Sequence, residues 1–279
     1  MASIFIAVLI AVFFFFPLMT YIIFWYDTGN SPYRDELAKE SGGRTTIWIL
    51  KGFLSSILSH IIIISSCPLA FVKRLWRPDP SDTTSSPPVI LIHGLYHNAS
   101  AWIFYRWWLR RAGYQRVYLF NYNSLKSTFW EISGQLEKWM AETARSFPGE
   151  AVLMVGHSTG GLLAKAYAGR KDGGDQGPAV RTVITLGSPH KGSRMAVFGM
   201  GRLAKSLVYG STLIGELGQI RIPSKVDCTA IYSPVDNMVL PAESLKAPPD
   251  WKEKRTGPIC HVSMLYHWGT FKQVLKCLT

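Results

Sequence analysis

The chain has 279 residues, of which 48% are hydrophobic and 17% charged, and its 30 Lys and Arg against 18 Asp and Glu give a net charge of +12 at pH 7. A charged fraction this low, together with 13% aromatic residues, excludes an intrinsically disordered chain. The four cysteines are too few for a disulfide framework and too far apart for a zinc site, so we expect no metal and no other cofactor.

Two long apolar stretches occupy the N-terminal part of the chain. Residues 2–26 contain no charged side chain, and residues 46–72 contain only Lys51 among Lys, Arg, Asp and Glu. Each stretch is longer than the roughly 20 residues that a helix needs to cross a ~30 Å hydrocarbon core. The sequence therefore predicts a membrane anchor in residues 1–72, with two transmembrane helices at about 2–26 and 46–72 joined by a polar loop, residues 27–45.

Each stretch also has an alternative interpretation. The first could be a cleaved signal peptide, although no basic segment precedes it and no Ala-x-Ala site follows it. The second could be a buried helix of a soluble protein, because several serines dilute its apolar character.

The distribution of charge predicts the orientation and the partners. Lys73, Arg74 and Arg77 follow the second stretch closely, which favours cytoplasmic termini and a C-terminal domain on the cytoplasmic side of the inner (cytoplasmic) membrane. Residues 1–72 carry four positive and four negative side chains, so the whole excess of charge lies in 73–279. We expect membrane lipids of an anionic leaflet as a partner. No basic helix with groove-reading spacing occurs, so nucleic acid is not expected, and the oligomeric state stays open.

A Pro/Ser/Thr-rich segment, residues 73–88, is a predicted linker to a single domain in residues 89–279. Short apolar runs alternate there with helical patterns. Strands are expected at 89–92, 117–120, 151–155, 180–186 and 229–232, and helices at 100–112, 128–146, 160–169 and 267–278. Continuous β-branched runs suit strands covered on both faces, so the pattern predicts an α/β fold with a mainly parallel central sheet and helices on both faces.

One serine lies at a predicted strand-to-helix turn. The buried run Val152-Leu153-Met154-Val155 leads directly into Gly156-His157-Ser158-Thr159-Gly160-Gly161, and a helix rich in small residues follows. Gly-x-Ser-x-Gly in this context predicts a sharp turn that exposes the serine hydroxyl at the N-terminus of a helix. Ser158 is therefore the expected nucleophile, and His157 is expected to pack or hydrogen bond within the turn.

A serine hydroxyl needs a histidine base and a carboxylate that orients it, which in this topology follow in the order Ser, acid, His. The loop after the last predicted strand offers Asp236 as the acid, with Glu243 as the fallback. Asp227 begins that strand, at the wrong edge of the sheet. His261 directly follows a short apolar run and is the expected base, with His267 as the alternative.

The same chemistry needs two N–H donors for the oxyanion. The Thr159 amide follows the nucleophile, and the loop Ile92-His93-Gly94-Leu95-Tyr96 offers the Leu95 amide as the second donor. Gly94 would let the main chain approach closely, while His93 is expected to brace the loop.

These segments together resemble the α/β-hydrolase superfamily, and within it bacterial triacylglycerol lipases and carboxylesterases. The resemblance rests on Val89–Gly94, Gly156–Gly161, Leu186–Gly192, Ser233–Asp236 and Cys260–Leu265. It implies an α/β-hydrolase fold with Ser158 as nucleophile, Asp236 as acid, His261 as base, and Leu95 and Thr159 as oxyanion donors. Two features depart from the family pattern, namely Cys260 in place of a frequent Gly and the predicted membrane hairpin.

The predicted function is a membrane-anchored serine hydrolase of the lipase or esterase type, which cleaves acyl esters of lipids through an acyl-enzyme. A lid or cap over Ser158 is expected in residues 190–225, and the Trp-rich basic helix in 101–111 suits either a headgroup boundary or ordinary packing on the sheet. The alternatives are a phospholipase or lysophospholipase, a thioesterase, an acyltransferase, and a non-catalytic membrane binding module.

Overall fold

The computed structural model describes residues 11–72, 75–76, 86–170 and 177–278. The first ten residues of the first apolar stretch, and most of the predicted linker, lie outside the described residues.

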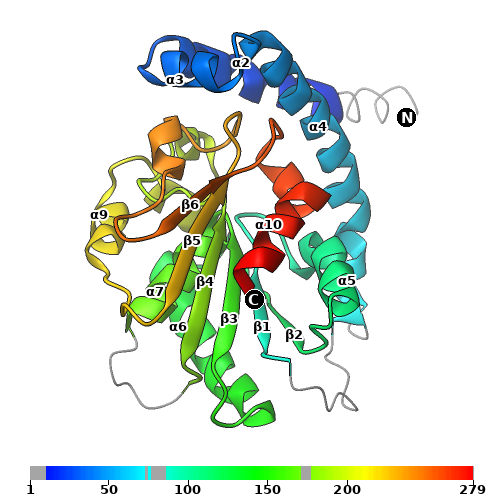
Figure 1. Cartoon of the computed structure of the whole chain (residues 1–279), viewed down its shortest axis with the longest axis vertical. Coiled ribbons are helices and arrows are strands. Elements are labelled where there is room, and N and C mark those ends of the chain that lie inside the picture. The colour runs from blue at the N-terminus through cyan, green and yellow to red at the C-terminus, as the bar shows by residue number, and fades with distance from the viewer. Residues whose placement is uncertain (1–10, 73–74, 77–85, 171–176, 279) are drawn as a thin grey trace.

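A six-stranded sheet in the order β2-β1-β3-β4-β5-β6 forms the centre of the main domain, residues 86–278, and every neighbouring pair of strands is parallel (Figure 1). The strands are β1 Val89–Ile92, β2 Val117–Phe120, β3 Val152–His157, β4 Val180–Leu186, β5 Asp227–Tyr232 and β6 Lys252–Arg255. Val89 and Leu91 enter one core and Ile90 and Ile92 the other, so both faces of the sheet are covered. The predicted parallel α/β architecture is confirmed.

Helices form a layer on each face of the sheet. One core contains side chains of α5 Ile103–Arg111 and α10 Trp268–Leu278; the other contains side chains of α6 Phe129–Thr143, α7 Thr159–Arg170, α8 Gly201–Ser206 and α9 Thr212–Gln219. A capping box at Thr128 and Glu131 fixes the start of α6. The two tryptophans of α5 lie on different faces of the helix. Trp108 is buried against the sheet, and Trp107 is exposed with the Arg111 guanidinium over its ring.

The sequence analysis missed one strand and, outside the predicted lid segment that contains α8 and α9, one helix. The strand is β6, whose four residues are Lys, Glu, Lys and Arg and give no apolar signal. It lies at the edge of the sheet, where charged residues protect a strand from pairing with another chain. The helix is α3 Tyr33–Glu40, in the segment expected to be a loop. Its Glu36 and Glu40 accept hydrogen bonds from Arg255 of β6 at 2.7 and 2.6 Å.

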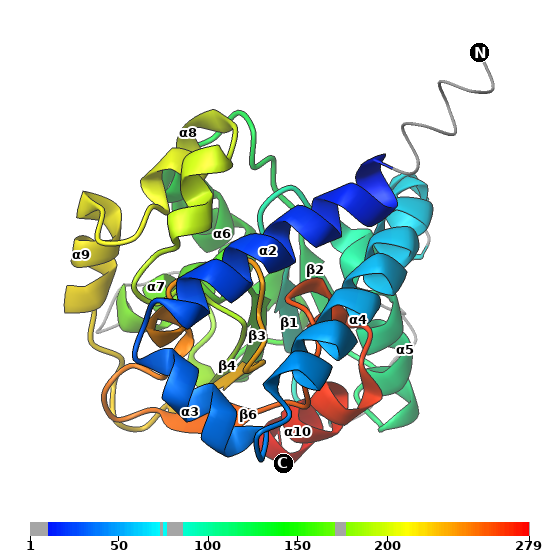
Figure 2. The ribbon, with the colours of Figure 1, turned by 90° about the horizontal axis from the view of Figure 1, so that it is seen from above.

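The N-terminal helices pack directly on the main domain. A π-helical turn, Ala11–Phe15, leads into α2 Phe16–Gly29, and α4 Thr45–Ser66 continues into a 3-10 turn, Cys67–Phe71. Helix α2 crosses the carboxyl edge of the sheet and α4 descends beside α5 (Figures 1 and 2). The Tyr21 hydroxyl of α2 donates to the Val235 carbonyl at 2.9 Å, in the loop after β5.

The two helices also approach each other closely, because a Cβ at Gly52 of α4 would lie 2.3 Å from the Tyr21 hydroxyl oxygen. Among the described residues, one helical segment, Thr45–Phe71, is long and apolar enough to cross a membrane.

Candidate active site

Ser158 is the single residue between β3, which ends at His157, and α7, which begins at Thr159. Its φ of +54° lies in the left-handed region, which is strained for a residue with a side chain. The neighbouring main chain holds it there. The Ser158 amide donates to the Leu186 carbonyl at 2.8 Å, and the Ser158 carbonyl accepts from the Ser188 hydroxyl at 2.8 Å. The predicted strand–turn–helix geometry is therefore present at this serine.

The two glycines that flank the turn are required by close main-chain contacts. A Cβ at Gly156 would lie 2.3 Å from the Gly160 carbonyl oxygen, and one at Gly160 would lie 2.1 Å from the Ile92 carbonyl oxygen. Both distances are far below van der Waals contact, so neither position accepts a side chain. The Gly-x-Ser-x-Gly pattern thus reflects the packing of β1, β3 and α7 around Ser158.

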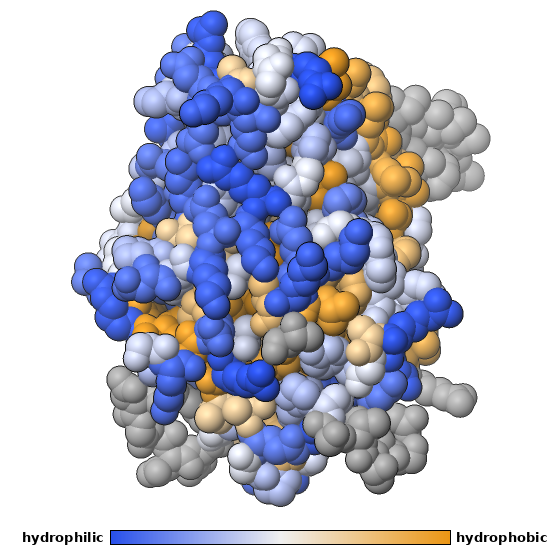
Figure 3. Space-filling view, viewed as in Figure 1, coloured by the Kyte–Doolittle hydropathy of each residue, from blue (hydrophilic) through white to orange (hydrophobic). Residues whose placement is uncertain are grey.

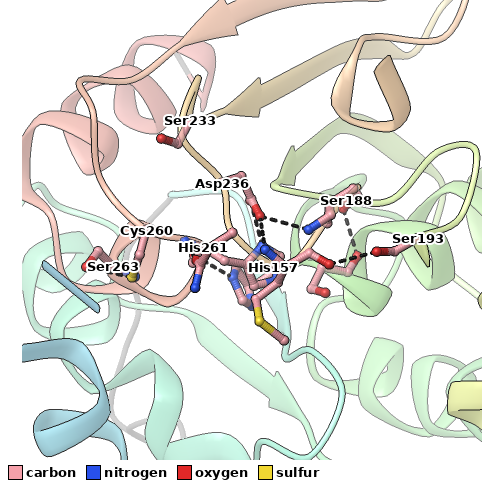
Figure 4. Close-up of polar contacts among 12 residues, drawn as sticks. His157, Ser188, Ser193, Ser233, Asp236, Cys260, His261 and Ser263 are labelled. Carbon is pink, nitrogen blue, oxygen red and sulfur yellow. Dashed lines mark hydrogen bonds and ion pairs between the residues drawn. The ribbon is translucent and has the colours of Figure 1, made fainter. Parts of the chain in front are cut away.

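The structure joins Asp236 and His261 by a hydrogen bond of 2.7 Å between Oδ2 and Nδ1 (Figure 4). Asp236 is fully buried, and its Oδ1 accepts from the Met238 and Val239 amides at 2.9 and 3.0 Å. Because the carboxylate can only accept, Nδ1 carries the imidazole proton and Nε2 is left with a free lone pair. This is the tautomer that a general base requires.

The Ser158 hydroxyl makes no hydrogen bond to His261 in the described part of the chain, but the three segments meet at one edge of the sheet. A Cβ at Gly187 would lie 3.1 Å from both Asp236 Oδ2 and His261 Nδ1, and Gly187 directly follows the residue that binds the Ser158 amide. The His157 ring lies 4.6 Å from the His261 ring, centroid to centroid. These contacts bring the ends of β3, β4 and β5 together.

The two predicted oxyanion donors lie beside the serine. A Cβ at Gly94 would be 2.9 Å from Ser158 Cβ, so the loop after β1 lies against the nucleophile. Neither the Leu95 nor the Thr159 amide donates a hydrogen bond to another described residue. Two N–H groups near a serine and without an acceptor are the arrangement that an oxyanion hole requires. They lie at the carboxyl ends of β1 and β3, two neighbouring strands. The chain leaves β1 toward β2 on one side of the sheet and leaves β3 toward β4 on the other. This switch point is the usual ligand site of an open parallel sheet.

Three histidines around the site, of which His93 and His157 are fully buried and His97 partly buried, have lowered pKa values and are neutral at pH 7. Burial lowers the pKa of His93 to about 4 and that of His97 to about 3, and it holds the pKa of His157 well below its usual range. His93 makes a 2.9 Å hydrogen bond from Nδ1 to the Gly94 carbonyl, which fits its expected bracing of the loop. The His97 ring stacks on that of His157 at 5.6 Å. None of the three therefore adds a positive charge beside His261 at neutral pH.

The alternative acid and base residues have partners elsewhere. His267 accepts the Thr270 amide on Nδ1 at 3.1 Å and so caps the N-terminus of α10. Glu243 accepts a hydrogen bond from the Tyr209 hydroxyl, and Asp227, the first residue of β5, accepts one from Lys252 at 3.0 Å.

Ser188 and Asn237 support the site, although the sequence analysis assigned a specific role to neither. Ser188 binds the carbonyl of the nucleophile, and Asn237 Oδ1 accepts the His261 amide at 3.3 Å. Asn237 follows the expected acid directly, which is the one sequence signal that could have singled it out.

The predicted lid segment divides into two parts. Helix α9 packs into the core, whereas the segment before α8 lies beside the oxyanion loop and exposes Val197, Phe198 and Met200. The Tyr96 hydroxyl donates to the Met200 carbonyl and accepts from the Met200 amide, both at 2.6 Å. Tyr96 therefore joins this segment to the loop that carries Leu95.

Comparison with known proteins identifies one family and a set of similar folds. The family model described as palmitoyl protein thioesterase matches residues 88–253. The mature lipase BlEst2 of Bacillus licheniformis is 20% identical with a TM-score of 0.57, over 73% of this chain and 94% of that one. The gene lin2722 product of Listeria innocua is 18% identical with a TM-score of 0.55, over 70% and 94% of the two chains.

EstA of Clostridium botulinum is 11% identical with a TM-score of 0.52, over 68% of this chain and 85% of that one. At these identities the solved structures establish the fold alone. No curated protein matches the chain.

Proposed function

The chain belongs to the palmitoyl protein thioesterase family, and we propose that it is a membrane-associated serine hydrolase that releases long-chain acyl groups through an acyl-enzyme. It is an α/β-hydrolase of the lipase, esterase or thioesterase type. The proposed catalytic residues are Ser158, Asp236 and His261, with the Leu95 and Thr159 amides as oxyanion donors.

The hydrogen bond between Asp236 and His261 carries the proposal, because it leaves the imidazole lone pair on Nε2 available. Nε2 takes the Ser158 proton as the serine oxygen bonds to the acyl carbon, and the two amides stabilise the resulting oxyanion. The imidazolium then gives its proton to the leaving group. In the second half-reaction, His261 takes a proton from water as the water oxygen bonds to the acyl carbon. The imidazolium then returns that proton to the Ser158 oxygen as its bond to the acyl carbon breaks and the fatty acid leaves.

A thioester is the preferred substrate in this proposal. The family match favours it, and a thiol leaving group with a pKa near 8.5 needs less help from the general acid than an alcohol does. The same steps also cleave an oxygen ester of a lipid, so a lipase or esterase is the second candidate.

The N-terminal helices support membrane association because they expose many large apolar side chains, where a helix in water would carry polar ones. The buried face of α4 carries small and polar residues, namely Gly52, Ser56, Ser59 and Ser66. Apart from Lys51 near its start, its exposed large residues are apolar, namely Ile47, Leu50, Leu54, Leu58, Ile61 and Ile64. An apolar strip along the upper right edge of the molecule follows α4 (Figure 3).

Helix α2 repeats this arrangement. Thr20 and Thr28 lie on its buried face beside Pro17, Tyr21 and Phe24, and its exposed large residues are again apolar. These are Phe14, Phe15, Phe16, Met19, Ile22, Trp25 and Tyr26, on or just before the helix. An apolar surface this extensive favours contact with acyl chains. Because α2 crosses the carboxyl edge of the sheet, its outer face would bring a membrane close to the site (Figure 2). The net positive charge of the main domain favours a leaflet that contains anionic lipid.

A matched pair of substrates tests the proposal. The full-length protein in detergent micelles is given a palmitoyl thioester and the palmitoyl oxygen ester of the same headgroup, beside Ser158→Ala and the control Ser65→Ala, which alters an exposed serine of α4. We expect Ser158→Ala to lose about 10³-fold or more in kcat and all fluorophosphonate labelling, and the control to lose neither. Labelling that persists in Ser158→Ala would place the nucleophile elsewhere. Faster hydrolysis of the oxygen ester than of the thioester would favour the lipase candidate.

A further inference from the structure

Three side chains from other segments hold the main chain around His261. The His261 amide donates to Asn237 Oδ1 at 3.3 Å, and the His261 carbonyl accepts from His157 Nε2 at 3.2 Å. The preceding amide, that of Cys260, donates to the Ser55 hydroxyl at 2.8 Å. The position of the imidazole therefore depends on Asn237 and Ser55 as well as on Asp236.

The first of these contacts continues into α2. Asn237 Nδ2 donates to the Thr20 hydroxyl at 2.7 Å, and that hydroxyl lies 2.9 Å from the Pro17 carbonyl. A hydroxyl has one proton, and the Pro17 carbonyl can only accept it, so Thr20 must present a lone pair to Asn237. This requirement turns the NH₂ group of Asn237 toward α2 and its oxygen toward the His261 amide. Thr20 is fully buried and Asn237 is 1% exposed, so water is excluded from the pair.

The second contact continues into α4. The Ser55 hydroxyl donates to the Gly52 carbonyl at 2.7 Å within the helix, so it presents a lone pair to the Cys260 amide. The Ser55 carbonyl in turn accepts from the Ser263 hydroxyl at 2.9 Å. Ser55 thus binds the chain on both sides of His261, through residues 260 and 263.

We infer that Thr20 and Ser55 are positioning residues for His261, so that α2 and α4 are part of the active-site frame as well as the proposed membrane surface. The inference rests on the proposed role of His261 as the base. Both residues precede position 88, where the family match begins, so they lie outside the matched segment of the fold. The polar residues on the inner faces of these two apolar helices hold the His261 loop in place.

The consequence for catalysis is quantitative. Proton transfer from Ser158 requires the imidazole at hydrogen-bonding distance, and a displacement of about 1 Å can cost about 100-fold in rate. The Thr20 and Ser55 hydroxyls bind Asn237 and the Cys260 amide rather than facing the nucleophile, so we expect their loss to lower kcat and leave KM nearly unchanged.

The test uses the full-length protein in detergent micelles, with the concentration of active sites titrated by complete fluorophosphonate labelling. Thr20→Val keeps the shape of the side chain and removes the hydroxyl, and Ser55→Ala removes the other hydroxyl. We expect each variant to lose about 10- to 100-fold in kcat per titrated site, with KM within about twofold. Thr20→Ser should restore most of the kcat. Thr46→Val and Ser65→Ala, which alter exposed hydroxyls of α4, should match the wild type.

Two further variants make the outcome decisive. In Asn237→Ala the link is already broken, so adding Thr20→Val should cause little further loss of kcat. A lower Tm with an unchanged kcat per titrated site, or no recovery in Thr20→Ser, would overturn the positioning role. His261→Ala is measured alongside them. If it keeps full activity, the proposed base is wrong; if it is inactive while Thr20→Val and Ser55→Ala keep full kcat, only the positioning inference fails.

Discussion

His157 donates a hydrogen bond from Nε2 to the main-chain carbonyl of His261 over 3.2 Å. Burial, reinforced by the neighbouring imidazole of His261, holds the pKa of His157 well below its usual range, so this ring is neutral and has a single N–H to donate. The residue before Ser158 is therefore bonded directly to the loop of the proposed base. This hydrogen bond links the serine turn to the histidine loop, and the neutral His157 ring places no second positive charge near the carboxylate of Asp236.

The two late histidines should differ sharply in function. His261→Ala should lower kcat by about 10³-fold or more, because the proton of Ser158 then has no acceptor. His267→Ala should keep activity and lose about 1 kcal/mol of stability, because it removes the cap of α10. Rates on a palmitoyl thioester and thermal melts of both variants measure this, and the reverse pattern of rates would exchange their roles.

Polar residues on the outer faces of α2 and α4 should release the protein from lipid without inactivating it. Ile22 and Leu54 are 56% and 55% exposed, and burying such a side chain contributes about 1.5–3 kcal/mol. The double variant Ile22→Glu/Leu54→Glu should bind zwitterionic vesicles at least about 100-fold more weakly while keeping its kcat in micelles. Vesicle flotation measures the binding, with Ser146→Glu, an exposed position in the 3-10 turn after α6, as the control for charge.

Removal of residues 1–72 should have a different effect from these outer-face changes. The truncation also removes Thr20 and Ser55 and exposes the apolar side chains that pack against α2 and α4. We expect the truncated chain to lose activity even on a water-soluble short-chain ester. Full activity of the truncated chain would show that these helices serve only for attachment.

The contact between Tyr96 and Met200 should control the opening of the segment before α8. Tyr96→Phe removes both hydrogen bonds of the hydroxyl, which together contribute on the order of 1–3 kcal/mol. Opening of residues 195–205 should become about 10-fold more frequent. Limited proteolysis at Arg202 and Lys205 measures this opening, and so does amide hydrogen exchange. Tyr26→Phe, at an exposed position of α2, is the control, and equal proteolysis of both variants would contradict a latch at Tyr96.

Buried histidines predict a loss of stability in weak acid. Burial lowers the pKa of His190 and of His97 to about 3 and that of His93 to about 4, against about 6.5 in the unfolded chain. The unfolded state therefore binds more protons below pH 6.5, and each group lowers the free energy of unfolding by up to about 1.4 kcal/mol per pH unit until its folded pKa is reached. Thermal melts from pH 8 to pH 4.5 should be flat above pH 6.5 and fall steeply below it.

His190→Gln isolates one of these contributions, because the His190 ring contacts Trp251 and Thr185, neither of which is a proposed catalytic residue. The variant should show a shallower decline of Tm between pH 6.5 and 4.5 than the wild type. An identical slope would mean that His190 is accessible to protons in the folded state.

The positions of five strands along the chain and that of the serine turn followed from the sequence, because both depend on neighbouring residues. The apolar runs at 89–92, 117–120 and 180–186 coincide with β1, β2 and β4, since strands covered on both faces must be apolar along their whole length. Gly156 and Gly160 identified the turn because only glycine fits the contacts there. The edge strand β6 was not predicted, because an edge strand is partly exposed to solvent and all four of its residues are charged.

The contacts around His261 could not be read from the chain. Thr20 and Asn237 are 217 residues apart, and Ser55 and Cys260 are 205 apart, and no local pattern relates them. The sequence alone identified two apolar N-terminal stretches, because their hydropathy is a property of consecutive residues. Only the tertiary structure decided that Thr20 and Ser55 face the catalytic loops while large apolar residues such as Ile22 and Leu54 face outward, because the direction of a side chain depends on what its helix packs against.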